Sequence, residues 1–264
     1  MLGRLLKYEF KSINRLAIPI SAIALIAAIM GALALKVVVN APENAAAIPT
    51  LICVLCVIAS AVAIFAYTVV VWILLLHRFY TNMYTDEGYL TFTLPVKPKL
   101  LIVSKLITAV VWSLISTVIV VLSVFVIITF GTSETLVNFQ WLEGFKELSA
   151  VGFNASHLVF GAIYLLTSVV FSFLIIYLSI TIAAVITRKH KILVAIGVYY
   201  GISTVVSIFT TLGEIVPNML MNNAEEFGRV ITVWNWFGIA IYIVFSVVAF
   251  VVCNELMKRK LNLD

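Results

Sequence analysis

Six long stretches of this sequence contain no Asp, Glu, Lys, Arg or His, and they constrain the fold more than any other feature. They cover residues 16–35, 49–76, 106–133, 158–187, 192–213 and 230–254. A helix needs roughly 20 apolar residues to cross about 30 Å of hydrocarbon, and each stretch is that long or longer. None shows the two-residue alternation of a membrane β-barrel strand. The sequence therefore predicts an all-α polytopic membrane protein with six transmembrane helices.

Composition agrees with this prediction and excludes two other classes of protein. The chain is 63% hydrophobic and 11% charged, whereas soluble domains are about 25% charged. Disordered chains are poor in apolar residues. We therefore expect residues 1–264 to form a single transmembrane domain in the lipid bilayer.

The charged residues predict the orientation of the chain, because Lys and Arg next to the spans stay in the cytoplasm. All basic residues except Lys36, Lys146 and Arg229 lie on one side, within residues 1–15, 77–105, 188–191 and 258–260. Most of the acidic residues lie on the other side. Both termini are therefore predicted to be cytoplasmic. Because the basic residues are divided among four segments beside the spans, nucleic-acid binding is not expected.

The predicted extracellular loops are residues 134–157 and 214–229. In the first, residues 137–148 have apolar side chains on one helical face and predict an amphipathic helix on the outer leaflet. Residues 213–229 suit either a partly inserted hairpin or an ordinary loop.

The spans contain no Asp, Glu, Lys, Arg or His, which argues against ion-coupled transport by this chain. Ion-coupled transporters generally carry such a residue at mid-membrane. A phosphate-binding loop needs a Gly-Lys pair, which this chain lacks. Cys53 and Cys56 lie one helical turn apart, but zinc needs further ligands, so no metal site is expected. Any transport work must therefore be powered by another chain.

The first fifteen residues predict an amphipathic helix on the cytoplasmic surface of the membrane. One face carries basic residues and the other apolar ones: Arg4, Lys7, Lys11 and Arg15 against Leu2, Leu5, Leu6, Phe10 and Ile13. Glu9 interrupts the apolar face, where lipid contact is costly. We hypothesise that Glu9 meets a polar or basic group of a partner protein. The alternatives are a simple anchor for anionic lipid and a Glu9 side chain that reaches water.

Residues 77–105 predict a second cytoplasmic surface. Thr85 or Asp86 is placed to cap a short helix, and Gly88 and Pro95 interrupt the segment. The segment is also rich in large apolar side chains, namely Tyr80, Tyr84, Tyr89, Leu90, Phe92, Leu94 and Val96. Such a patch is typical of a protein docking surface. Packing against the inner ends of the chain's own helices is the alternative.

Five short motifs within residues 1–106 resemble a known family. They are Leu5-Leu-Lys-Tyr-Glu-Phe-Lys11, Arg78-Phe-Tyr80, Thr85-Asp-Glu-Gly-Tyr-Leu90, Thr93-Leu-Pro-Val96 and Ser104-Lys-Leu106. In this order they resemble small six-span permease subunits of the type-2 exporter class of ATP-binding cassette (ABC) transporters, of the kind found in Gram-positive bacteria. From Lys146 onward only the pattern of spans is similar.

The resemblance implies a non-enzymatic permease subunit of the bacterial cell membrane. Two permease subunits, identical or different, would form the translocation path. A separate cytoplasmic ABC ATPase subunit would bind ATP and Mg²⁺, so this chain would bind no cofactor. The surface that receives the ATPase motion and tilts the second and third spans would consist of Asp86, Glu87, Gly88, Tyr89, Leu94 and Pro95, supported by Lys7, Glu9 and Lys11.

Small and hydroxylated residues of the later spans are candidates for packing and for the path. Gly197 and Gly201 form a small-xxx-small motif, which suits internal packing or dimer contact. The candidates to line a path are Ser203, Thr204, Ser207, Thr210 and Thr211 in the fifth span and Tyr164, Ser168, Ser172 and Tyr177 in the fourth. Ordinary helix–helix hydrogen bonding is the alternative role for these hydroxyls.

An uncharged path suits export of an amphipathic or apolar cargo, such as a lipid or an antimicrobial peptide. The main alternative function is a polytopic scaffold or sensor that transports nothing and whose cytoplasmic segment recruits a partner.

Overall fold

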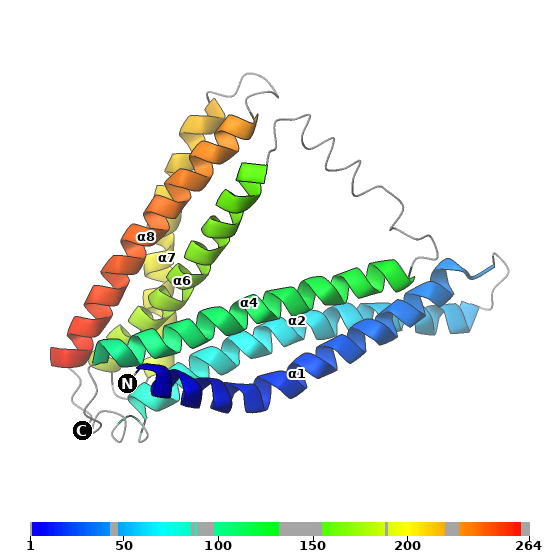
Figure 1. Ribbon diagram of the computed structural model, residues 1–264, viewed down its shortest axis with the longest axis horizontal. Coiled ribbons are helices and arrows are strands. Elements are labelled where there is room, and N and C mark those ends of the chain that lie inside the picture. Colours follow the sequence, from blue (N-terminus) through cyan, green and yellow to red (C-terminus); the bar gives the residue numbers. More distant parts are fainter. Residues whose placement is uncertain are drawn as a thin grey trace. The chain divides into compact units, whose positions relative to one another are not determined.

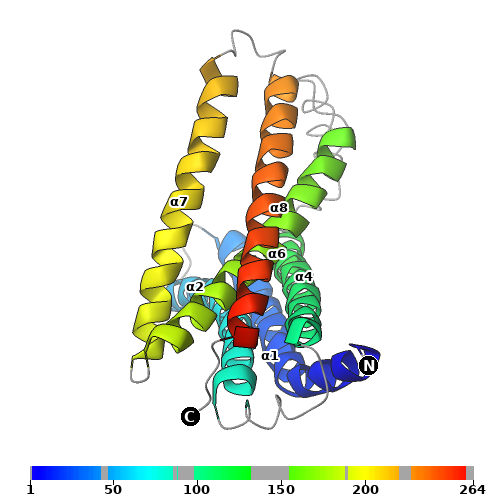
Figure 2. The same cartoon turned by 90° about the vertical axis from the view of Figure 1, so that its left-hand side faces the viewer.

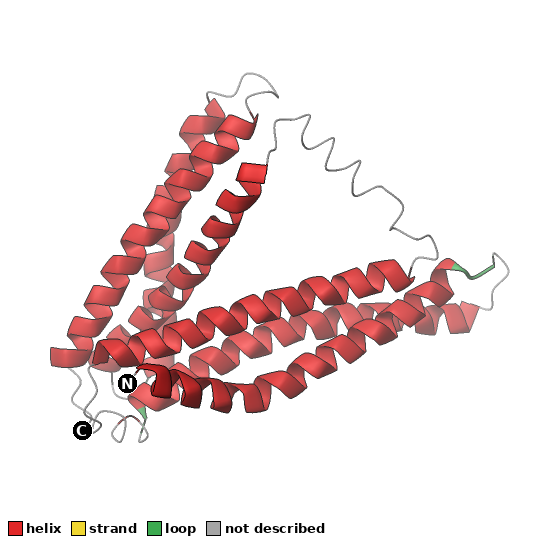
Figure 3. Cartoon of the chain, viewed as in Figure 1, coloured by secondary structure: helices red, strands yellow, loops and turns green. Residues whose placement is uncertain are grey.

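The computed structural model describes residues 2–42, 47–85, 88, 98–131, 155–187, 190–219 and 227–259. Over these ranges the chain forms long helices and no strand (Figures 1 and 3). The helices are α1 (Leu2–Val39), α2 (Ala47–Tyr84), α4 (Pro98–Gly131), α6 (Ala155–Ile186), α7 (Lys191–Met219) and α8 (Phe227–Arg259). All six are long and apolar enough to cross a membrane. Over the described ranges this confirms the predicted all-α class and the six helices able to span a membrane, as in a multi-pass membrane protein.

The helices extend beyond the charge-free stretches that predicted them. Helix α2 continues to Tyr84 and α4 begins at Pro98, so residues 85–97 separate them and not the whole of 77–105. Likewise α7 continues to Met219 and α8 begins at Phe227, within the predicted loop 214–229. Charged residues mark where a helix leaves hydrocarbon, whereas its backbone hydrogen bonds continue into water. The predicted outer helix at 137–148 lies outside the described residues.

Residues 2–15 are the first turns of α1 and are continuous with the span that follows. Their basic side chains are exposed, whereas Ile13 on the opposite face is buried. Pro19 lies inside α1. It lacks the N–H that would bond to the Arg15 carbonyl, and its ring crowds that carbonyl, which bends a helix. Figure 1 shows α1 bent in its amino-terminal half.

The chain forms two compact units, each built from segments that are distant in sequence. Unit 1 contains Met1–Leu2, Leu76–Val110 and Gly144–Asp264, and unit 2 contains Gly3–Leu75 and Val111–Glu143. Helices α2 and α4 therefore each contribute residues to both units.

In unit 2, small residues allow α1 to approach α2 and α4 closely. A Cβ atom added at Gly31 of α1 would lie 2.6 Å from Ser60 Cβ of α2. One added at Gly131 of α4 would lie 2.9 Å from Leu35 Cβ of α1. Such contacts stabilise transmembrane bundles, because lipid leaves van der Waals packing as a main driving force.

Buried hydroxyls also connect the helices of unit 2. Ser116 donates to the Trp112 carbonyl at 2.8 Å, so its oxygen is available to accept the Tyr67 hydroxyl at 3.2 Å. Ser21 Oγ lies 3.1 Å from the Tyr67 oxygen. Trp112 Nε1 donates to Asn14 Oδ1 at 3.1 Å. These bonds join α1, α2 and α4 through polar groups that would be costly to leave unpaired in hydrocarbon.

In unit 1, α6 contacts α7 and α8, and α7 contacts α8 (Figure 2). Aromatic pairs follow the contact between α6 and α8. Phe160 lies 5.2 Å from Trp236 and Phe171 lies 4.9 Å from Tyr242, measured between ring centroids. Because the residue numbers rise together along the two helices, α6 and α8 run parallel.

Candidate functional site

The predicted coupling segment follows the end of α2. Of its residues, Gly88 is described and buried, whereas Asp86, Glu87, Tyr89, Leu94 and Pro95 lie outside the described residues. The Thr85 hydroxyl donates to the Thr81 carbonyl at 2.5 Å, and the Gly88 N–H donates to the Thr85 carbonyl at 2.7 Å. Helix α2 therefore ends in a hydrogen-bonded turn that leads directly into the segment.

Gly88 occupies a position where a side chain does not fit. A Cβ atom there would lie 2.7 Å from the Met83 carbonyl oxygen and 2.8 Å from its carbon. Both are backbone atoms of the last turn of α2, so they cannot move aside as a flexible side chain can. The turn therefore requires glycine at this position.

Replacing Gly88 by alanine is expected to lower stability by about 1 to 3 kcal/mol, the usual range for overpacking, because the turn must open to admit the methyl group. Thermal unfolding of the purified protein measures this. Gly3→Ala is the matched control, since a Cβ atom at Gly3 meets nothing within 4 Å. Equal unfolding temperatures for the two variants would contradict the close approach.

The end of α2 that leads into this turn is anchored to α6 by aromatic stacking. The rings of Phe79 and Tyr177 are 3.7 Å apart between centroids and 9° from parallel. Both side chains are 1% exposed, and the neighbouring Met83 and Phe173 are 0% exposed. Tyr177, a candidate to line the path, therefore lies in the core of unit 1.

One threonine hydroxyl joins three helices close to this stack. Thr181 of α6 donates its only hydroxyl hydrogen to the Tyr177 carbonyl at 2.7 Å. Its oxygen is then left to accept the Tyr84 hydroxyl of α2 at 2.6 Å and the Cys253 thiol of α8 at 3.3 Å. We call Tyr84, Thr181 and Cys253 the Thr181 junction. All three side chains are buried.

The other flank of the segment is buried as well. At the start of α4, Ser104 and Thr108 are 1% exposed and Lys105 is 5% exposed. The Ser104 hydroxyl donates to the Leu101 carbonyl at 2.9 Å, and Thr108 donates to Ser104 at 2.8 Å. Tyr84 and the start of α4 are therefore buried by other parts of this chain, as in the alternative that the segment packs against the chain's own helices.

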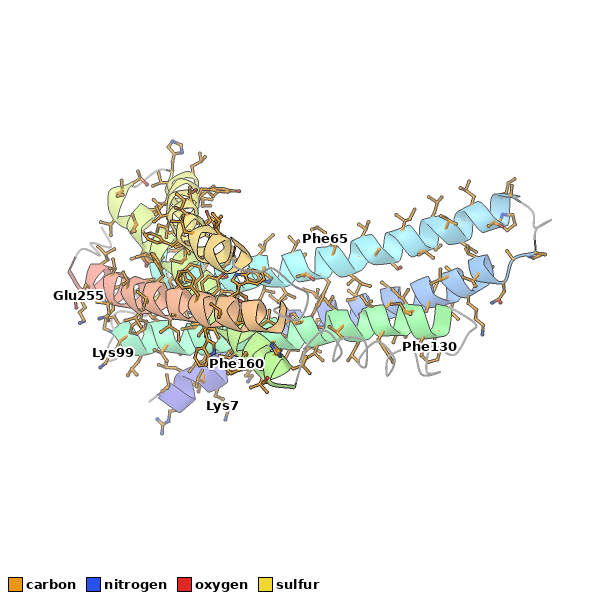
Figure 4. All side chains as sticks on the ribbon, turned by 90° about the horizontal axis from the view of Figure 1, so that it is seen from above. Lys7, Phe65, Lys99, Phe130, Phe160 and Glu255 are labelled. Carbon is orange, nitrogen blue, oxygen red and sulfur yellow. The ribbon has the colours of Figure 1, made fainter. Side chains whose placement is uncertain are left out.

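The predicted supporting residues lie in the first turns of α1. Lys7 and Lys11 are exposed, and Figure 4 labels Lys7 with its side chain directed away from the ribbon. Glu9 is less exposed than either lysine.

Of the α7 hydroxyls that were candidates for a path, those of Thr204, Ser207, Thr210 and Thr211 are bonded within their own helix. Thr204 donates to the Tyr200 carbonyl at 2.8 Å, Ser207 to Thr204 at 2.9 Å and Thr210 to Ser207 at 2.9 Å. Thr204 and Ser207 are exposed, and Ser203 is half-buried. An exposed hydroxyl bonded in this way can face lipid or a second chain at little cost.

The candidates on α6 are divided between two kinds of contact. Ser168 donates to the Leu165 carbonyl of its own helix at 2.8 Å. The Tyr164 hydroxyl instead lies 3.3 Å from the Tyr242 hydroxyl of α8. Tyr164 therefore helps to hold α6 against α8.

Gly197 and Gly201 lie on an open face of α7. A Cβ atom at either position would meet nothing within 4 Å among the described atoms. Tyr200, between them in sequence, is 66% exposed. Within the described part of this chain the motif therefore packs no neighbouring helix closely.

Sequence reasoning missed the buried polar side of α4. Ser104, Thr108, Trp112 and Ser116 recur every four residues, the spacing of one helical face, and all four are buried. This spacing was a usable signal in the sequence. The partners that these residues meet, such as Tyr67 and Asn14, carry no comparable signal.

Within the described ranges, no three His, Cys, Asp or Glu side chains gather in a way that could hold a metal ion. No protein family, curated protein or solved structure matches this chain.

Proposed function

We propose that this chain is the membrane-spanning permease subunit of an ABC transporter, which exports an amphipathic or apolar substrate. A separate cytoplasmic ATPase subunit binds ATP and Mg²⁺ and supplies the energy. The chain lies in a bacterial cell membrane with both termini in the cytoplasm, and it pairs with a second permease subunit.

The main support is the segment at residues 85–97 and the way its flanks are held. Its motifs resemble those of permease subunits, and its start is a turn that admits only glycine at position 88. The α2 residues before it are stacked on and hydrogen-bonded to α6. A segment held so firmly at its start can transmit a push from a docked protein, whereas a flexible linker would absorb it.

Two further observations fit the proposal. The charge-free spans offer no group for ion coupling, which requires an outside source of energy. The open face of α7 at Gly197 and Gly201 offers a close-packing surface to the second permease subunit.

The proposed mechanism follows from these placements. ATP binding draws the ATPase subunits together, and their movement displaces residues 85–97 of each permease. The helices joined to this segment then change tilt, so that the path between two permease subunits opens alternately to each side. An uncharged path suits an apolar cargo, and measured export of a small, highly charged solute in preference to an amphipathic one would contradict this cargo class.

Co-purification followed by an ATPase assay in lipid tests the proposal. An ABC ATPase from the same organism should co-purify with this chain, and its rate of ATP hydrolysis should change when it is incorporated into a bilayer with the permease. The double variant Glu87→Gln, Tyr89→Ala should weaken ATPase binding at least about tenfold, equivalent to about 1.4 kcal/mol of docking energy. Both the co-purification and the change in hydrolysis rate should decrease accordingly. Lys36→Gln is the control, because Lys36 lies in the last turn of α1, far along the helix from Lys7, Glu9 and Lys11. It should leave co-purification and the hydrolysis rate unchanged. If no ATPase co-purifies, the scaffold alternative gains support.

A further inference from the structure

The end of α2 is attached to α6 at two levels. Phe79 stacks on Tyr177, and the Tyr84 hydroxyl bonds to Thr181. A single attachment would leave α2 free to pivot about it. Two attachments, about one helical turn apart along both helices, fix the tilt of α2 against α6 as well as its position.

Helix α6 is in turn attached to α8 along most of its length. The contacts run from Phe160 with Trp236 to Thr181 with Cys253, and the pairs of Tyr164 and Phe171 with Tyr242 lie between them. Sliding α6 along α8 would break all of these contacts at once. Such a long contact resists relative motion, because packed aromatic pairs have discrete arrangements.

The Thr181 junction closes this connection at the end nearest the proposed coupling segment. Its hydrogen bonds have one consistent direction, with the Tyr84 and Cys253 hydrogens both given to Thr181 Oγ1. Thr181 and Cys253 are 0% exposed and Tyr84 is 5% exposed, so water cannot replace a broken bond. Any motion that separated α2 from α6 here would leave buried polar groups unpaired.

From these contacts we infer that the end of α2 (residues 76–84), α6 and α8 move as one rigid body. The inference rests on the proposed function and deepens it, because it identifies which helices receive the motion. A displacement of residues 85–97 is delivered through the Thr181 junction to α6 and α8. The motion is therefore not confined to the second and third spans that flank the segment.

A disulfide across the junction tests the contact between α6 and α8. In the full chain with Cys53→Ala and Cys56→Ala, Thr181→Cys places a second thiol opposite Cys253, whose sulfur lies 3.3 Å from Thr181 Oγ1. Iodine takes two electrons from the two thiols, which release two protons, so the S–S bond forms and the iodine becomes two iodide ions. The ATPase reconstituted in lipid with the bridged permease should hydrolyse ATP at the same rate as it does with the reduced permease. Failure to form the bridge, or a rate that falls on bridging and recovers on reduction, would overturn the inference.

Spin labels test the connection of α2 to α8 through Thr181 without relying on ATP hydrolysis. His77 of α2 and Lys258 of α8 are exposed and can be replaced by labelled cysteines in the chain with Cys53→Ala and Cys56→Ala, in which Thr181 is kept. Double electron–electron resonance in bilayers should give one narrow distance distribution, unchanged by the ATPase and a non-hydrolysable ATP analogue. A shift of the distance on adding the ATPase and analogue would refute a rigid body. A broad distribution for the permease alone would refute it even if no ATPase associates, so this failure is distinct from failure of the proposed function.

Two matched variants at Thr181 assign the rigidity to its hydroxyl. Thr181→Val keeps the side-chain shape but gives Tyr84 and Cys253 no acceptor, and it should broaden the measured distribution. Thr181→Ser keeps the acceptor and should leave the distribution narrow. Indistinguishable distributions for the two variants would contradict the role of the junction.

Discussion

Replacing Gly31 by leucine is expected to separate α1 from α2 and to lower stability by about 3 kcal/mol, the upper end of the usual cost of overpacking. Even the first atom of the new side chain would lie 2.6 Å from Ser60 Cβ, and Ser60 cannot retreat, because that atom is fixed to the α2 backbone. The unfolding temperature in detergent should fall by roughly 6 to 12 °C. Size-exclusion chromatography and thermal unfolding of the purified protein measure the effect.

Gly197→Leu provides the matched control for this experiment. It makes the same chemical change in another spanning helix, but at a position with nothing within 4 Å. Its unfolding temperature should stay within about 2 °C of the original, which corresponds to less than 1 kcal/mol. If Gly197 contacts a second permease subunit, the same variant should reduce the fraction of oligomer seen in size-exclusion chromatography without lowering the unfolding temperature. A similar loss of stability in both variants would refute the contrast between the two glycines.

Replacing Phe79 by alanine is expected to cost about 3 kcal/mol, the lower end for removal of a buried aromatic ring. The lower end applies because a helix unfolded within lipid keeps its apolar side chains in an apolar solvent, so most of the loss comes from packing. The stack on Tyr177 at 3.7 Å disappears and leaves a cavity beside Met83. Thermal unfolding should show a decrease of roughly 6 to 12 °C.

Phe65→Ala on the same helix is the control for this prediction. Phe65 is 72% exposed, and Figure 4 shows its side chain projecting outward from α2. Its removal should change the unfolding temperature little, since it fills no packed space. Should Phe65→Ala prove as destabilising as Phe79→Ala, the difference in burial between the two rings would not govern stability.

The six spans could be predicted from the sequence because the physics of each span is local. A stretch without charge such as 49–76 needs only its own composition to cross a bilayer. The ends of the helices could not be predicted in the same way. Residues 77–84 carry His77 and Arg78 and read as a loop, yet they continue α2 because Phe79, Met83 and Tyr84 are buried within unit 1.

The residues around the candidate site illustrate the same limit. Gly88 could be singled out, since a glycine beside a predicted helix end marks a turn. Thr181 and Cys253 could not, because a threonine and a cysteine in apolar spans have no distinguishing pattern. Their role depends on α6 and α8 meeting the end of α2, which is a property of tertiary packing and of no single segment.

The interleaving of the two units constrains how the chain is made. Synthesis proceeds from the amino terminus, so residues 76–84 leave the ribosome well before Thr181 and Cys253 exist. In the nascent chain, Phe79 and Tyr84 therefore lack their later partners, the Tyr177 ring and the Thr181 hydroxyl. Unit 2 gains all its described segments once α4 has been inserted, whereas unit 1 must wait for α8. The end of α2 consequently leaves its apolar side chains uncovered until the last span has been inserted, which makes this segment the one most exposed to incorrect contacts during synthesis.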